Sequence, residues 1–374
     1  MDNFIGILNN TNLEENFNSL CKNRPVYMLP FASRYRLVDV CISNMVNNGI
    51  KTVAIYTGEK IRSTMDHLSD GKPWNLNSRF QGLFLYPPIT QELSIERLGD
   101  LADFYSTLSF LETAREENVM VQDSNVIFMK NLDEAYKKFT ENDADILMMY
   151  VKQSDSAGEY VNTDKLHLDQ QGYVTNIGIN LGTETEFNMY INTLFIKKEV
   201  LINLIKESVE KGNASSLKDA IIKNKNTLNI MSYPVSGFVE IIKDSRTYFH
   251  ANLSLLDMNK FKELFINNGR VMTKTKDEAS TIYRDYPEVE NSLIANGCEI
   301  EGDVENSIIF RGVKIGKNAI VKNSIIMQKT VIEEGAVVVN SIIDKNSIVE
   351  KEVSLVGSVN QPYIVGKSEV AEKD

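Results

Sequence analysis

The sequence predicts two domains of different architecture. The first is an α/β domain with a Rossmann-like, mostly parallel sheet, and the second is a C-terminal left-handed parallel β-helix. The chain has 374 residues, more than a single hydrophobic core usually serves. Up to about residue 250, strand patterns alternate with helical ones, which is typical of a parallel sheet covered by helices. From residue 291 onward a short motif recurs at nearly constant spacing, which indicates stacked coils.

The strand and helix alternation begins at the N-terminus. Phe4–Leu8 is apolar and compatible with a strand. Apolar residues in 37–46 recur at spacings of three and four, which places them on one face of a helix. Asn48-Gly49 is expected to end this helix, because glycine enters the left-handed region without a Cβ clash. The β-rich run 51–57 follows, so the pattern is a helix leading into a strand.

Two further segments extend this pattern. Val126–Phe128 and Ile146–Val151 are expected to be strands, joined by a helix whose apolar positions follow Asn131, a suitable N-cap. A helix is also expected over 101–114. Ligands of such folds bind at the carboxyl ends of the strands, so we expect the functional cleft there.

The β-helix is predicted from a repeat of the form Asn-Ser-(Leu/Ile)-Ile, with separations of 15, 17 and 17 residues, at 291–294, 306–309, 323–326 and 340–343. Glycines and short polar residues lie between the copies, as in the hexapeptide repeat of left-handed β-helices, where each coil packs on the next. A sandwich of short strands is the alternative. The predicted boundaries are residues 1–261 for the α/β domain, 262–286 for a linker and 287–374 for the β-helix.

The bulk composition excludes several classes of protein. A net charge of -11 and a pI near 5.0 argue against nucleic acid or a membrane as partner, since both need a concentrated basic surface. No leader peptide or membrane span is recognised, and a cytoplasmic protein is expected. The histidines His67, His167 and His250 all precede the repeat, so an acyltransferase with a histidine base on the β-helix is not expected.

The segment 24–50 carries a family resemblance. Its run Leu-Pro-Phe-Ala-Ser-Arg-Tyr-Arg-Leu-Val-Asp, residues 29–39, is similar to the P-F-G-G-K/R-Y-R-[IL]-[IV]-D segment of ADP-glucose pyrophosphorylases, also called glucose-1-phosphate adenylyltransferases. These enzymes join glucose 1-phosphate to ATP. A nucleotide-diphospho-sugar transferase domain followed by a left-handed β-helix is also that family's domain order, so the resemblance covers essentially the whole chain.

The phosphate-binding loop of the family is not retained. The family has G-G-x-G-[ST]-R-L after its first strand, whereas residues 9–15 here read Asn-Asn-Thr-Asn-Leu-Glu-Glu. No Lys or Arg occurs from Met1 to Cys21, so a triphosphate would meet repulsion where it needs compensation. Asn9 and Asn10 are therefore expected to belong to a vestigial nucleotide pocket, or simply to an Asn-rich turn.

Four further family positions have lost their charge. By alignment, Val26 stands at a phosphate-contacting lysine and Leu181 at the sugar-phosphate lysine of a V-E-K-P motif. The two metal-binding aspartates, of the G-D-H-I-Y and G-Y-W-x-D-[IV]-G-T motifs, are replaced by Asn125 and Ile241. We therefore expect no catalytic residue and no metal site.

Part of the pocket wall is expected to persist. Gly99 and Asp100 fall in a segment similar to the family's G-T-A-D-A motif, Gly99 at a base-contacting position, although the pair could equally cap the following helix. Asp123, two positions from Asn125, and Glu240, next to Ile241, are the carboxylates considered for a rebuilt metal site. On a strand, neighbours point to opposite faces, so Glu240 could serve only if the register slipped.

The resemblance is to the non-catalytic, GlgD-type members of the family. It implies a regulatory subunit that modulates a catalytic partner in a heterotetramer for glycogen biosynthesis, with self-association as a further contact. No cofactor is expected on this chain, while the partner would require Mg²⁺. The alternatives are a nucleotidyltransferase with residual activity and a stand-alone sugar-nucleotide sensor.

Three arginines are candidates for binding a small anionic effector. Arg24 and Arg36 match family effector positions near the domain junction, and Arg34 lies between them. The guanidinium group suits phosphate because its fork donates two hydrogen bonds. Asn23 and Pro30 depart from other family effector positions. The alternative is structural pairing of these arginines with Asp39 or with an interface carboxylate.

Overall fold

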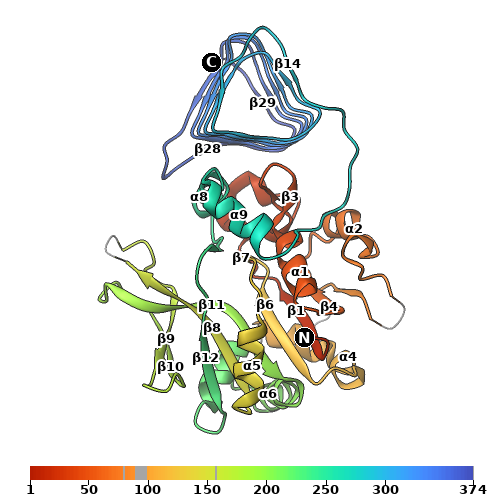
Figure 1. Cartoon of the computed structure of the whole chain (residues 1–374), viewed down its shortest axis with the longest axis vertical. Coiled ribbons are helices and arrows are strands. Elements are labelled where there is room, and N and C mark those ends of the chain that lie inside the picture. The colour runs from red at the N-terminus through yellow and green to blue at the C-terminus, as the bar shows by residue number, and fades with distance from the viewer. Residues whose placement is uncertain (79–80, 89–98, 156–157, 374) are drawn as a thin grey trace.

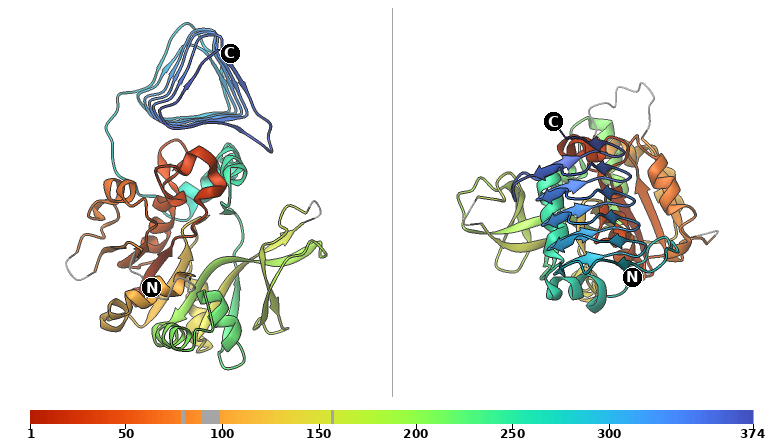
Figure 2. Two further views of the ribbon diagram at one scale, coloured as in Figure 1. Left: turned by 180° about the vertical axis from the view of Figure 1, so that it is seen from behind. Right: turned by 90° about the horizontal axis from the view of Figure 1, so that it is seen from above.

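The computed structural model describes residues 1–78, 81–88, 99–155 and 158–373. An α/β domain forms one end of the molecule, and a three-sided β-helix lies across it (Figure 1). Seen from above, the coils of the β-helix stack along the top of the first domain (Figure 2). Both predicted architectures are confirmed. No helix in the described ranges is long and apolar enough to cross a membrane.

A nine-stranded sheet forms the centre of the first domain, in the order β10-β9-β11-β6-β1-β4-β5, with β8 and β12 joined through β11. Parallel pairing links β6, β1, β4 and β5, whereas β11 runs antiparallel to β6 and β8. The strands are β1 (Phe4–Asn9), β4 (Thr52–Tyr56), β5 (Leu83–Tyr86), β6 (Asn118–Asp123), β8 (Ile146–Ser154), β9 (Asp164–Leu168), β10 (Val174–Ile179), β11 (Glu186–Lys197) and β12 (Ile230–Pro234).

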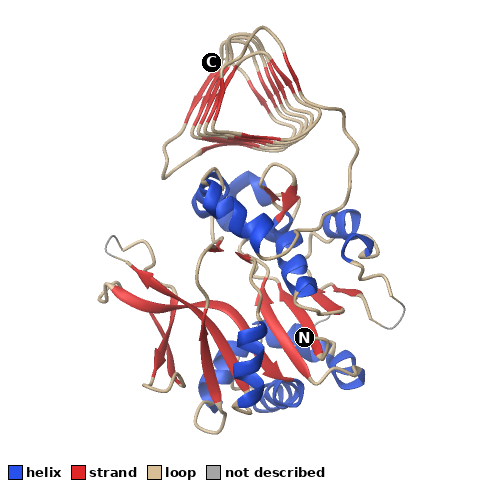
Figure 3. Cartoon of the chain, viewed as in Figure 1, coloured by secondary structure: helices blue, strands red, loops and turns tan. Residues whose placement is uncertain are grey.

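Helices cover both faces of this sheet (Figure 3). One apolar core contains side chains from α1 (Leu37–Asn47), α5 (Asp133–Glu141) and α8 (Ser245–Ser254). A second core on the other face contains side chains from α3 (Gly99–Ser106), α4 (Leu108–Thr113), α6 (Lys198–Lys211) and α7 (Leu217–Asn224). The other α-helices of the described residues are α2 (Arg62–Leu68) and α9 (Met258–Lys262).

The helix predicted over 37–46 is confirmed as α1. Gly49 follows it with φ of +88°, the conformation that glycine tolerates best. The N-cap of α5 is Leu132 and not the expected Asn131; Asn131 precedes it, and its Oδ1 accepts a hydrogen bond from the backbone N–H of Asp133 at 2.8 Å.

Two predictions for the first domain need correction. The expected strand Val126–Phe128 exists as β7, but it pairs with β13 (Val239–Ile241) in a separate two-stranded sheet. The strand that joins the main sheet in this part of the chain is β6, and the alternation of strand and helix patterns in the sequence did not predict it. The helix expected over 101–114 is in fact two helices, α3 and α4, separated at Thr107. The hydroxyl of Thr107 donates a hydrogen bond to the carbonyl of Asp103.

The β-helix has three parallel sheets, one for each side of the triangle in Figure 1. The first contains β14 (Ile282–Tyr283), β17 (Glu299–Ile300), β20 (Lys314–Ile315), β23 (Val331–Ile332), β26 (Ile348–Val349) and β29 (Val370–Ala371). The second contains β15 (Val289–Glu290), β18 (Asp303–Glu305), β21 (Ile320–Lys322), β24 (Val337–Val339) and β27 (Ser354–Val356). The third contains β16 (Leu293–Ile294), β19 (Ile308–Ile309), β22 (Ile325–Ile326), β25 (Ser341–Ile343) and β28 (Tyr363–Val365).

The predicted repeat builds one corner and one side of four successive coils. Asn291, Asn306, Asn323 and Asn340 all have φ between +40° and +49°, and Asn is among the few residues besides Gly that tolerate this region. The serines that follow form an internal ladder: the hydroxyl of Ser307 accepts the backbone N–H of Ser324, whose hydroxyl in turn accepts that of Ser341. The repeat therefore encodes the corner and satisfies buried backbone groups.

One face of the β-helix is buried against the first domain. Ile308, Ile325 and Ile342 share a continuous core with residues of that domain, whereas their neighbours Ile309, Ile326 and Ile343 fill the interior of the β-helix. Both isoleucines of these three repeats are thus buried, one against the first domain and the other inside the β-helix. α8 and α9 lie between the β-helix and the sheet (Figures 1 and 3).

The connector between the domains is shorter than the predicted 262–286. A π-helical turn, Glu263–Asn267, continues directly from α9, and the first β-helix strand already begins at Ile282. The stretch 268–281 between them is held to the first domain, because Thr273 donates a 2.6 Å hydrogen bond from its hydroxyl to Asp39 of α1.

Candidate functional site

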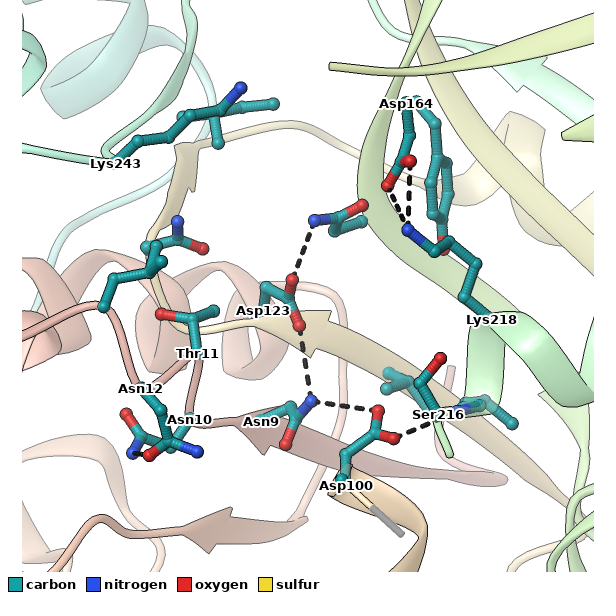
Figure 4. A pocket seen from close by; sticks show the side chains of 18 of the residues that line it. Asn9, Asn10, Thr11, Asn12, Asp100, Asp123, Asp164, Ser216, Lys218 and Lys243 are labelled. Atoms are coloured by element: carbon teal, nitrogen blue, oxygen red, sulfur yellow. Dashed lines mark hydrogen bonds and ion pairs between the residues drawn. The ribbon is translucent and has the colours of Figure 1, made fainter. Parts of the chain in front are cut away.

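A pocket of about 570 Å³ opens where β1 and β6 end (Figure 4). Asn9 and Asp123 are the last residues of these two parallel strands, and they are direct partners in the ladder. The pocket therefore lies at the carboxyl ends of the strands, where the alternating pattern of the sequence predicts it. The structure also brings the predicted pocket residues Asn10, Gly99 and Asp100 to its wall.

Asp123 lies at the centre of this pocket. Its carboxylate accepts hydrogen bonds from the amide of Asn9 at 3.5 Å and from the amide of Asn192 at 2.8 Å. Asn192 reaches it from β11, whose register against β8 shifts between Tyr190 and Leu194; such a bulge redirects a side chain. Burial, and then the charge of Asp100, raise the pKa of Asp123 to about 7.

Asp100 ties three elements together. Its carboxylate accepts from the amide of Asn9 at 3.2 Å and from the backbone N–H of Leu217, the first residue of α7, at 3.0 Å. Burial raises the pKa of Asp100 to about 6. Gly99 is required here for packing, because a Cβ atom at this position would lie 2.6 Å from the carbonyl oxygen of Ser215.

The loop after β1 turns without glycine. Asn12 has φ of +51°, so asparagine supplies the left-handed residue, as its tolerance of that region permits. The amide of Asn10 donates to the side-chain oxygen of Asn12 at 2.7 Å. The loop then enters the 3-10 segment Glu14–Cys21, whose first turn is acidic.

The charges that line the pocket are mainly negative. Four aspartates face two lysines, and the lining residues of these kinds are Asp100, Asp103, Asp123, Asp164, Lys218 and Lys243. The charge of Lys218 is already balanced within the protein, because its ammonium group forms an ion pair with Asp164 at 2.8 Å. Burial lowers the pKa of Lys243, the other lysine of the lining.

Sequence comparison places this architecture in a family. Residues 16–165 match the sequence model of the nucleotidyl transferase family, and residues 279–361 match that of the GlmU-like, C-terminal hexapeptide family. The glycogen biosynthesis protein GlgD of Geobacillus stearothermophilus is 34% identical over 85% of this chain and 82% of its own length, and GlgD of Bacillus subtilis is 30% identical with the same coverage. A glucose-1-phosphate adenylyltransferase of Mycoplasma mobile is 26% identical over 79% of the chain and 78% of its own length. The chain belongs to the GlgD group of the glucose-1-phosphate adenylyltransferase family.

The four family positions that have lost their charge fall in different places. Asn125 and Ile241 both line the pocket, where the aligned metal-binding aspartates of the family would be expected. Val26 is buried in the apolar core of the first domain, and Leu181, which is 71% exposed, lies on a turn after β10 outside the pocket lining. Of the four positions assigned by resemblance, the two metal positions therefore lie at the pocket and the two lysine positions do not.

The carboxylates considered for a rebuilt metal site do not converge. Asp123 lines the pocket, whereas Glu240 is absent from its lining and its neighbour Ile241 faces it. Across the described ranges, no group of three or more His, Cys, Asp or Glu side chains is arranged to hold a metal ion. Successive side chains of a strand point to opposite faces, so Glu240 of β13 points away from the pocket that Ile241 lines.

The candidate effector arginines separate into two groups. Arg24 and Arg36 line a second cavity of about 170 Å³ at the junction of the two domains, together with Lys345 and Lys367 of the β-helix. Arg34 is exposed, with its guanidinium 6.0 Å from the centroid of the Tyr35 ring, and is not part of this lining. Sequence reasoning missed Lys345 and Lys367, because no local pattern shows that the β-helix brings them to Arg24.

Arg24 makes the structural pairing that the sequence left open. It forms a buried ion pair with Asp344 of the β-helix, and its Nε donates to the carbonyl of Leu20 at 2.8 Å. Arg36 donates to the carbonyl of Met28 at 3.2 Å. Asp39 pairs with neither arginine side chain in the described structure; its carboxylate contacts His67 at 2.6 Å and accepts the backbone N–H of Arg36.

The junction cavity is short of negative charge. Burial lowers the pKa of Arg36 to about 10, and Asp39 offsets only part of this effect. Burial lowers the pKa of Lys345 well below its usual value, and the nearby Arg36 and Arg24 lower it further. An anion between Arg36 and Lys345 would relieve both groups, because it would supply the missing opposite charge.

Proposed function

We propose that this chain is a regulatory subunit without adenylyltransferase activity of its own. It would bind a catalytic glucose-1-phosphate adenylyltransferase subunit in glycogen biosynthesis and raise or modulate that subunit's turnover. The observation that carries this proposal is the pocket at the ends of β1 and β6, which retains the position and size of a substrate site but is lined by four aspartates and two lysines.

The charge balance of this pocket supports the absence of chemistry. Transfer of a nucleotidyl group needs cations or Mg²⁺ where negative charge builds up on phosphate oxygens. Here Asn125 offers one neutral oxygen, Ile241 offers no ligand atom, and Lys218 is paired with Asp164. We infer that no Mg²⁺ is held by this chain and that the metal required for turnover is bound by the partner.

The two alternatives differ in what they require. An active enzyme would need a metal site built on Asp123 or Glu240. Because side chains alternate along β13, Glu240 points away from the pocket that Ile241 lines. A stand-alone sugar-nucleotide sensor would bind its ligand and form no complex with a catalytic subunit. Assembly therefore separates the sensor from the regulatory subunit.

Regulation by a small anion would act at the domain junction. Arg36 comes from the first domain and Lys345 from the β-helix, so an anion held by both would favour one relative arrangement of the domains. A partner subunit that contacts both domains would sense that arrangement, because coupling requires contacts that differ between two states. We propose a heterotetramer with the catalytic subunit as the functional assembly.

The test compares ADP-glucose formation by three samples: this chain, the catalytic subunit of the same organism, and their mixture. We expect no turnover from this chain and at least about fivefold higher turnover from the mixture than from the catalytic subunit, within the usual range of coupling between sites. Co-elution in size-exclusion chromatography is the accompanying control. Turnover by this chain alone, or a mixture that does not co-elute, would refute the proposal.

A further inference from the structure

The pocket at the ends of β1 and β6 also indicates what it can bind, whether or not the chain is a regulatory subunit. We propose that it binds an uncharged, hydroxyl-rich ligand, either a hexose or the ribose of a nucleoside, and discriminates against phosphate esters of the same compounds. The argument rests on hydrogen-bond acceptors that lack donors.

Asn125 supplies the most informative of these acceptors. The residue is 2% exposed and lines the pocket, and its amide nitrogen donates to the carbonyl of Ile242 at 2.9 Å. That bond fixes the orientation of the amide group, since the reverse orientation would place two oxygens together. Its Oδ1 is left without a hydrogen-bond partner among the described residues.

Two more polar atoms of the pocket lining also lack a hydrogen-bond partner. The amide nitrogen of Asn10 is used by Asn12, and the Oδ1 of Asn10 has no partner in the described part of the chain. The hydroxyl of Thr11 is likewise unpaired within those ranges. A buried polar atom without a partner costs about 1–3 kcal/mol, so a ligand that donates hydrogen bonds to this loop would recover that cost.

Most side-chain donors that line the pocket are already in use. The exceptions within the described ranges include the ammonium group of Lys243 and the hydroxyl of Thr11, which can donate as well as accept. The amide nitrogens of Asn9 and Asn192 donate to the carboxylates of Asp100 and Asp123, and the ammonium of Lys218 donates to Asp164. The carboxylates themselves, when ionised, only accept. The unfilled hydrogen-bonding capacity of the pocket therefore favours a ligand rich in donors.

A sugar meets this requirement and a phosphate does not. Each hydroxyl group can donate and carries no charge, whereas a phosphate dianion brings only acceptors and would meet Asp100 and Asp123. The size of the pocket, about 570 Å³, lies within the range of about 300–1,000 Å³ usual for small-molecule sites. Tyr190 and Leu194 line it as well and give a sugar ring an apolar face to lie against.

Titration calorimetry with matched pairs of probes tests this proposal on the full chain: glucose against glucose 1-phosphate, and adenosine against AMP. We expect one neutral probe to bind saturably and its phosphorylated counterpart to bind at least about tenfold more weakly, a difference of about 1.4 kcal/mol. The pair that responds identifies the ligand as a hexose or a nucleoside.

Two variants locate the binding. Thr11→Val keeps the shape of a half-buried loop residue without its hydroxyl, and Asp123→Asn removes the central charge; each is expected to weaken the neutral probe about tenfold. Asp303→Asn on the outer face of the β-helix is the control and leaves affinity unchanged. If Asp123→Asn does not fold, the affinity of Thr11→Val for the neutral probe alone shows whether binding occurs in this pocket.

Three results would overturn the proposal. The first is binding of the phosphorylated probe as tightly as the neutral one. The second is no binding by either neutral probe up to its solubility limit, or binding that both pocket variants leave intact. The third is saturable binding of Mg²⁺ alone that Asp123→Asn abolishes, which would make the pocket a cation site.

Discussion

At the level of single residues, the stability of the fold depends on a buried ion pair between Arg24 and Asp344. Asp344 is fully buried and its partner nearly so. Removal of one member of a buried pair leaves an uncompensated charge, which costs about 3–5 kcal/mol. We therefore expect Asp344→Asn to lower the free energy of unfolding by about that amount, measured by urea denaturation.

Glu305→Gln is the matched control for this prediction. Glu305 pairs with Lys322 on the exposed surface of the same β-helix, where an ion pair contributes about 0–1 kcal/mol. Equal effects of the two substitutions would show that the pair between Arg24 and Asp344 is not buried as described.

Asp123 gives the folded chain a distinctive pH dependence. Burial raises the pKa of this carboxyl to about 7, so the folded state holds its proton at a pH where the unfolded chain has released it. Its contribution to stability is complete below the unfolded pKa and is lost as pH rises through the folded pKa. Relative to wild type, Asp123→Asn should therefore gain stability from pH 5 to pH 8, on the order of 2 kcal/mol at about 1.4 kcal/mol per pKa unit. Chemical denaturation at four pH values would measure it, and a difference that stays constant with pH would contradict the assignment.

At the scale of elements, the β-helix repeat encodes a backbone conformation as well as a core. Asn323 occupies a corner with φ of +46°, where a residue with a Cβ and no local hydrogen bond is strained by about 1–2 kcal/mol. Asn323→Ala should lower the free energy of unfolding by about 1 kcal/mol, and Asn323→Gly should leave it nearly unchanged because glycine accepts this φ. Thermal denaturation of both variants provides the measurement. Equal loss in the two would mean that the asparagine side chain, and not the backbone, is what matters.

The same scale shows where sequence patterns are sufficient. The four Asn-Ser-(Leu/Ile)-Ile repeats, α1 and β1 follow local rules of periodicity and capping, and they were predicted at their places. β6 and the break at Thr107 were not, because a short apolar strand and a side-chain hydrogen bond inside a helical pattern leave no periodic signal. Of the pocket, Asn9, Asn10, Asn125 and Ile241 were predicted by alignment, whereas Asn192 depends on a bulge in β11 that no local pattern marks.

For the whole molecule, the contact between the domains matters most. The aliphatic face formed by Ile308, Ile325 and Ile342 shares its core with the first domain, and the junction cavity is lined by residues of both domains. Lys345 and Arg36 meet there only because the two domains pack together, which is why sequence analysis of either domain could not identify Lys345.

An anionic effector of the mixed assembly would act through this cavity. We expect Lys345→Ala to reduce the response of the mixture to inorganic phosphate or a phosphorylated sugar by about fivefold or more, since one charge-assisted contact is lost. Lys351→Ala, on the exposed surface of the β-helix, is the matched control and should respond like wild type. An unchanged response in Lys345→Ala would place the effector elsewhere.

The most direct test of the central claim, that this chain regulates and does not catalyse, is ADP-glucose formation by a mixture in which only the partner has been disabled. The catalytic subunit would carry a substitution in its own metal-binding carboxylate, and this chain would remain wild type. We predict a complex that assembles and shows no turnover, because Asn125 and Ile241, which line the pocket, supply one neutral oxygen and no carboxylate for Mg²⁺. Turnover by that complex would contradict the account, since only this chain could then be supplying the chemistry.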